Sequence, residues 1–106
     1  MAKKPIVILC TTPDMESAKE IAQHLVEKKL AACCNILPQV TSVYSWQGKI
    51  EQAHEHLLLI KTQLDNFKNL EEVILERHPY ELPEIISLDI TAGSQKYLDW
   101  ISENVG

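Results

Sequence analysis

The stretch that decides the fold runs from Cys33 to Thr62, CCNILPQVTSVYSWQGKIEQAHEHLLLIKT. Its two arms are rich in β-branched and aromatic residues and flank a turn at Gly48, which is typical of a long β-hairpin. A three-residue turn, Trp46-Gln47-Gly48, pairs even-numbered positions with even-numbered ones, whereas a two-residue turn, Gln47-Gly48, pairs even with odd. We favour the three-residue turn because it gathers apolar residues on one face, together with two histidines. The residues on that face are Ile36, Val40, Tyr44, Ile50, Leu58, Ile60, His54 and His56.

The hairpin is too long to lie inside one compact subunit. Each arm of about 14 residues spans about 46 Å, whereas a globule of about 100 residues has a radius of gyration of about 13 Å. Either the hairpin bends, for which Pro38 offers a site, or its far end with Tyr44, Trp46 and Ile50 is covered by another subunit. Pro38 also indicates an edge strand, because proline cannot donate to a ladder. An apolar edge of this length aggregates unless it is paired, so we expect an oligomer.

The remaining elements follow from apolar spacing and from helix start and stop signals. They are a strand over 5–11, a helix from a cap at Thr12 or Asp14 to about 30, a helix over 64–77 ended by Pro79, a strand over 85–91 and a helix after Ser94. The order β-α-β-β-α-β plus a terminal helix predicts an α+β, ferredoxin-like sandwich that forms one domain over residues 1–106. One face of its sheet is left without a helix, and another subunit is the natural candidate to cover it.

Composition narrows the classes of partner. The formal charge of −5 argues against a nucleic-acid or anionic-membrane surface. No apolar run approaches the ~20 residues of a membrane helix, and the first run ends at Thr11-Thr12-Pro13-Asp14 without a cleavage site. We therefore expect a cytoplasmic protein without membrane insertion, whose three cysteines, Cys10, Cys33 and Cys34, are reduced.

Cys10 lies at the end of the first strand, just before a helix N-terminus. This position favours the thiolate, which binds soft metals such as copper or attacks electrophiles. The alternative is a buried apolar cysteine that only packs. An enzyme would need a base beside Cys10, and a pair with His78 is conceivable. Nothing in the local sequence supports that pair or an oxyanion site, so we expect no catalysis.

Two other groups of residues carry candidate chemistry. The segment from His78 to Glu84 is stiffened by two prolines and carries His78, Tyr80, Glu81 and Glu84, which suits a metal, acid/base or small-ligand site. In the alternative reading, its polar groups only cap backbone. His54 and His56 share a strand face at a chelating distance for Zn²⁺, Ni²⁺ or Cu²⁺, although two ligands fall short of the usual four for structural zinc, and a solvated patch is the alternative.

The ordered set of motifs along the chain resembles the CutA divalent-cation tolerance family over nearly its whole length. The motifs are VILCTTPD (7–14), LAAC (30–33), YSWQGKI (44–50), LIKT (59–62), HPYELPEI (78–85) and YLDW (97–100). The resemblance implies a cytoplasmic, P-II-like homotrimer linked to copper and other divalent-metal tolerance, with copper binding attributed to Cys10 and His78. Some bacterial relatives carry a second histidine where this chain has Arg77, and a guanidinium cannot replace an imidazole ligand.

Two functions remain open at this point. The first is a non-enzymatic, copper-binding, metal-responsive trimer that uses Cys10 and His78. The second is a P-II-like trimer that senses a small ligand in intersubunit clefts and passes the signal on. The residues expected to line those clefts are Tyr44, Trp46, Lys61, Tyr80, Glu81 and Glu84.

Overall fold

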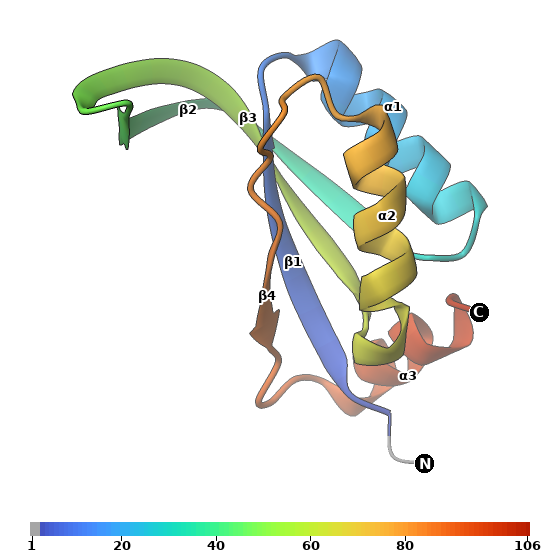
Figure 1. Cartoon of the computed structure of the whole chain (residues 1–106). Helices are drawn as coiled ribbons and strands as arrows, with labels where there is room; N and C mark the ends of the chain where they lie inside the picture. Colours follow the sequence, from blue (N-terminus) through green and yellow to red (C-terminus); the bar gives the residue numbers. More distant parts are fainter. Residues whose placement is uncertain (1–2) are drawn as a thin grey trace.

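The computed structural model describes residues 3–106 and contains the elements that the sequence predicts, with a short 3₁₀ turn added before the second helix (Figure 1). In chain order the elements are β1 (Pro5–Thr12), α1 (Met15–Glu27), β2 (Cys33–Trp46), β3 (Lys49–Gln63), η1 (Leu64–Asn66), α2 (Phe67–Arg77), β4 (Ile86–Asp89) and α3 (Gln95–Glu103). Within this described range, no helix is long and apolar enough to cross a membrane.

The four strands form one antiparallel sheet in the order β2-β3-β1-β4. This is the ferredoxin-like arrangement, so the predicted fold class is confirmed. The strand that carries Pro38 lies at an edge, as expected. β4 is shorter than the predicted strand over 85–91, because its partner β1 begins at Pro5: the ladder ends with Ile6 opposite Asp89, and the Ile90 N–H then donates to the Pro5 carbonyl at 3.2 Å.

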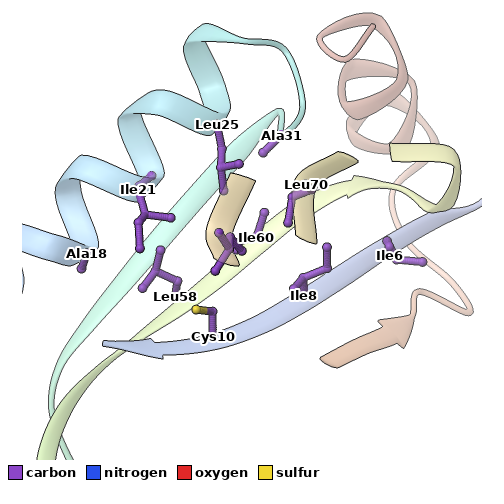
Figure 2. Packing of buried hydrophobic residues seen from close by; sticks show 12 residues of the cluster. Ile6, Ile8, Cys10, Ala18, Ile21, Leu25, Ala31, Leu58, Ile60 and Leu70 are labelled. Carbon is purple, nitrogen blue, oxygen red and sulfur yellow. The ribbon is translucent and has the colours of Figure 1, made fainter. Parts of the chain in front are cut away.

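The core lies between the sheet and the helices α1 and α2 (Figure 2). Alternate residues of β1 and β3 face the helices and are fully buried, as the strand period of two requires. Apolar residues of α1 and α2 at helical spacing meet them from the other side. The largest members of this cluster are Ile6, Ile8, Ile21, Leu25, Leu58, Ile60, Leu70 and Ile74.

The ends of the two long helices follow from local sequence. The Ser17 N–H donates to the Asp14 carboxylate at 2.7 Å, so Asp14, rather than Thr12, is the cap of α1. That hydrogen bond lowers the pKa of Asp14. α2 stops at Arg77, because Pro79 favours an extended conformation for the residue before it. The chain then crosses to β4 through residues 78–85, which we call the connector.

The predicted three-residue turn of the hairpin is wrong. Trp46 pairs directly with Lys49, which leaves a two-residue turn of Gln47 and Gly48. Both residues have positive φ angles, 52° and 80°, as a type I′ turn requires. This turn type matches the right-handed twist of the flanking strands, which is the physical reason that it replaces the longer turn.

A bulge in β2 also corrects the predicted face of the hairpin. Between the pairs Leu37–Leu57 and Val40–Glu55, β2 has two residues and β3 has only one, His56. The extra residue turns the outer part of β2 over. Val40 and Tyr44 therefore share a face with Glu55, not with Leu58 and Ile60 as the sequence suggested.

The outer half of the hairpin curves away from the sheet (Figure 1). The bulge at Pro38 and Gln39, where Gln39 has a φ of 61°, marks the start of that half. Its apolar side chains remain open to solvent in the single chain, with Ile50 76% exposed. The hairpin thus bends, as the first alternative predicted, and coverage of its far end by another subunit stays a prediction.

Candidate functional site

A cleft of about 800 Å³ lies between the outer half of the hairpin and the connector. The connector contributes side chains held between two prolines, and β2 contributes aromatic rings two residues apart. Five of the six residues expected to line a ligand cleft meet here. They are Tyr44, Trp46, Tyr80, Glu81 and Glu84.

Lys61, the sixth residue, is not part of the cleft. It pairs with Val7 and Cys33 near the other end of β3, and its ammonium group donates to Asn35. Six residues of extended strand separate it from Glu55, a distance of about 20 Å. Within the single chain Lys61 therefore does not line this cleft, and its place in a cleft between subunits stays a prediction.

Sequence reasoning missed Glu55, Ser42 and Thr11, which also line the cleft. Glu55 is the residue between His54 and His56, which drew the attention of the sequence analysis instead. The signal that could have found it was Pro38. A proline inside a strand indicates a bulge, and counting one extra residue there places Ser42 and Tyr44 on the face of Glu55.

A chain of hydrogen bonds connects β1 to the floor of the cleft through the connector. The Nε2 atom of His78 lies 2.8 Å from the Thr11 carbonyl oxygen, and the Tyr80 N–H donates to Nδ1 of His78 at 3.0 Å. The Tyr80 hydroxyl donates to the Glu55 carboxylate at 2.8 Å. This pattern assigns the neutral imidazole with its proton on Nε2. Both nitrogens of His78 are therefore engaged in holding the connector.

The Glu55 carboxylate is the most unusual charge of the site. Its residue is only 7% exposed, and the Tyr80 hydroxyl is its hydrogen-bonding partner. The ion pairs found within residues 3–106 join Lys4 to Asp89 and Arg77 to Glu20, so neither neutralises it. Burial, and then the hydrogen bond to Glu55, raises the pKa of Tyr80, which keeps its phenol a neutral donor.

Cys10 is a core residue, as the packing interpretation of the sequence predicted. Its side chain lies beside Leu58 within the apolar cluster (Figure 2). Burial, and then the negative charges of Glu84 and Glu55, raises the pKa of its thiol to about 12. The buried apolar cysteine, our alternative reading, describes it correctly.

Cys10 and His78 nevertheless lie close together. The Cys10 thiol and the His78 Nε2 both contact the carbonyl oxygen of Thr11, at 3.9 Å and 2.8 Å. Thiolate and imidazole are suitable ligands for copper. Here, the raised pKa of the thiol favours its protonated form and both imidazole nitrogens make hydrogen bonds, so copper binding would require both groups to exchange partners. Over residues 3–106, no three His, Cys, Asp or Glu side chains gather closely enough to hold one metal ion.

The two histidines of β3 share one face, as the sequence predicted, but remain a pair. His54 Nδ1 lies 3.4 Å from the Thr41 hydroxyl, and His56 Nδ1 is buried without a hydrogen-bonding partner. Arg77, which stands at the position of a candidate second ligand, forms an ion pair with Glu20 and ties α2 to α1. Its role in this fold is structural.

Comparison with known proteins decides the family. A sequence profile described as "CutA1 divalent ion tolerance protein" matches residues 6–104. The chain belongs to this family. The divalent-cation tolerance protein CutA of Thermus thermophilus is 49% identical over 100 residues, which cover 94% of this chain and 97% of the relative.

Solved CutA structures agree with the fold. The Thermus thermophilus divalent cation tolerance protein superposes with a TM-score of 0.94 at 48% identity, covering 96% of this chain and 99% of that one. CutA1 from Oryza sativa also gives a TM-score of 0.94, at 40% identity, covering 97% and 94% of the two chains. The resemblance to the CutA family seen in the sequence is thus confirmed.

Proposed function

We propose that this CutA chain acts in divalent-cation tolerance as a non-enzymatic homotrimer that senses a small ligand in the cleft between hairpin and connector. The observation that carries the proposal is the chain of hydrogen bonds from Thr11 through His78 and Tyr80 to Glu55. It holds the cleft wall rigidly and connects it to β1 at the centre of the sheet. The volume of the cleft, about 800 Å³, falls in the range of small-molecule sites.

Assembly supports this function because the single chain leaves apolar strands uncovered. Ile86 and Leu88 on β4 and Val43 and Ile50 on the hairpin are half or more exposed. Edge strands of this kind aggregate unless they are paired, and pairing among three copies would cover them. A neighbouring subunit would then wall the open side of the cleft, and ligand binding would be transmitted through the trimer as a cytoplasmic signal.

A non-catalytic role agrees with the chemistry of the two residues nearest to a nucleophile and base. The Cys10 thiol, with its raised pKa, is a poor nucleophile, and His78 has no free nitrogen with which to accept a proton. Catalysis by a thiolate would require both to change.

Copper binding at Cys10 and His78 is the second candidate. Their convergence on the Thr11 carbonyl favours it, because a small local rearrangement would bring a thiolate and an imidazole to one ion. Such binding would release the thiol proton and break the contact between His78 and Thr11. Copper would thus loosen the connector, whereas a ligand in the cleft would tighten it.

A thermal-shift screen distinguishes the two functions. The purified protein is tested with neutral, anionic and cationic small molecules, and separately with Cu(I) under reducing conditions and Cu(II) in air. We expect organic ligands to raise the melting temperature in the parent protein and in the variant Trp100→Leu, but not in Trp46→Leu. Stabilisation by copper alone, lost in Cys10→Ala, would overturn the cleft proposal and favour the copper site.

A further inference from the structure

We infer that the cleft between hairpin and connector binds a small organic cation, an amine or quaternary ammonium compound, between its aromatic rings and its carboxylates. The inference rests on the proposed function of the cleft and names the class of its ligand. It follows from the charge of the lining, the burial of one carboxylate, the aromatic walls and the size of the space.

The lining carries negative charge only. Glu55, Glu81 and Glu84 contribute carboxylates, and among residues 3–106 no lysine, arginine or histidine lines the cleft. The field of two of these carboxylates extends beyond the cleft, because Glu84 and Glu55 help to raise the pKa of Cys10. An anionic ligand would be repelled, whereas a cation would be drawn in.

Glu55 lacks a counter-charge. Glu55 is 7% exposed as a whole residue, and a carboxylate on so buried a residue loses part of its hydration, which is unfavourable unless a cation or hydrogen bonds compensate. The Tyr80 hydroxyl supplies one hydrogen bond, and the ion pairs within the described chain supply no cation. The missing positive charge is what a cationic ligand would bring.

Aromatic rings line the cleft on both the hairpin and the connector. Tyr44 and Trp46 lie two residues apart on the same face of β2 and are 43% and 47% exposed, so their rings remain available. Tyr80 adds a third ring, kept neutral by its hydrogen bond to Glu55. Rings around a cation supply quadrupole attraction, and tryptophan supplies the strongest. Carboxylates combined with such rings favour an organic cation over a neutral ligand.

A bare metal ion fits this site poorly. Metal ligands must approach within about 2.0–2.6 Å of one ion, and the described part of the chain brings no three suitable side chains together. The cleft of about 800 Å³ is also far larger than one ion needs. Aromatic walls cannot replace the oxygen ligands of a hard dication, but they suit the diffuse charge of an alkylated ammonium.

Choline tests the inference against its neutral isostere, 3,3-dimethylbutan-1-ol. The experiment uses the Trp100→Phe background, so that Trp46 is the remaining tryptophan of the two in the chain. We expect choline to change the Trp46 fluorescence saturably, with an affinity at least tenfold higher than that of the isostere and lower at high salt. The substitution Glu84→Gln, on an exposed side chain, should weaken choline binding at least tenfold. Glu103→Gln on α3 is the matched control and should leave it unchanged.

Equal binding of choline and its isostere, an affinity that Glu84→Gln does not change, or the absence of saturable binding would each overturn the inference. The failure of the inference is distinguishable from failure of the proposed function. If choline does not bind while a neutral or anionic ligand stabilises the protein in a Trp46-dependent manner, the cleft senses another class of ligand. If no organic ligand stabilises the protein, the proposed function itself falls.

Discussion

The base and the tip of the hairpin are built from similar sequence and have opposite environments. At the base of β3, Leu58 and Ile60 are fully buried, whereas Ile50 at the tip is 76% exposed. All three are even-numbered residues of one strand, on one face. The difference lies in what covers them, because α1 and α2 pack on the base, whereas the tip has no such cover among residues 3–106. Apolar residues at the base therefore stabilise the subunit, and those at the tip are available for ligand or partner.

The strongest test of this comparison removes one apolar side chain from each end. Leu58→Ala should lower the free energy of unfolding by about 2–5 kcal/mol at any protein concentration, because it leaves a cavity in the core. Ile50→Ala should leave the stability of the subunit nearly unchanged and shift the assembly toward smaller species on dilution. Urea denaturation and light scattering after size exclusion measure the two effects. An Ile50→Ala cost equal to that of Leu58→Ala in dilute monomer would contradict the comparison.

The second test removes a hydrogen bond to Glu55, which lies on β3 between the base and the tip of the hairpin. Tyr80→Phe removes the hydroxyl that donates to Glu55 while keeping the ring. We expect a loss of about 1–2 kcal/mol, since a buried carboxylate loses its hydrogen-bond donor and nearby solvent screens part of the effect. Chemical denaturation of the variant beside Tyr97→Phe, at a ring outside the cleft, measures it. No loss relative to that control would show that Glu55 finds another partner.

The third test uses pH to probe the base through Cys10, which pairs with Leu58. The folded thiol has a pKa of about 12, whereas an unfolded cysteine titrates near 8.5. Below a pH of about 8.5 the thiol is protonated in both the folded and the unfolded chain, so its contribution to the stability of the fold is fully present. As pH rises from about 8.5 to 12, the unfolded chain loses this proton first, so stability falls by up to about 1.4 kcal/mol per pH unit for this thiol. Urea midpoints at pH 8 and pH 10 should differ less in Cys10→Ala than in the parent, and an unchanged difference would argue for an accessible thiol.

The smallest effects belong to the turn at the tip. Gly48→Ala should cost about 1 kcal/mol, because φ is 80° and no atom within 4 Å would contact the added methyl group, so the cost is that of the backbone alone. Gln47→Asn, at a φ of 52°, should stabilise the hairpin by a few tenths of a kcal/mol. Thermal denaturation of the two variants should therefore shift the melting temperature in opposite directions. Shifts of the same sign would contradict a type I′ turn.

The fold could be predicted almost completely, since element order, edge strand and helix ends follow from local periodicity, Pro38 and Pro79. The cleft was predicted in part. Residues near one another in sequence, such as Tyr80 and Glu84, were grouped correctly, because the connector is short and stiff. Glu55 was left out of the cleft residues, and Lys61 lies outside the cleft of the single chain, because the strand residues that line a cleft depend on the register between strands. A shift of one residue moves a side chain to the other face, and Pro38 was the one local sign of such a shift.

The sequence left the protonation state of Cys10 open for a different reason. Its position before a helix favoured a thiolate and its apolar neighbours favoured packing, and the field of a helix N-terminus is weaker than the loss of hydration in a packed core. Burial of a particular side chain depends on neighbours from distant parts of the chain. Leu58 and the carboxylates of Glu55 and Glu84 are 45 or more positions away along the chain.

The bulge at Pro38 and Gln39 separates two properties of the cleft, the curvature of the hairpin and the identity of the side chains that face Glu55. The pairs on either side of the bulge are Leu37 with Leu57 and Val40 with Glu55. Loss of a single codon between them would leave one residue opposite His56 and restore regular pairing, while Tyr44 would keep the face of Glu55. A lineage that loses this codon would therefore change the bend of the hairpin and keep the side chains of the cleft.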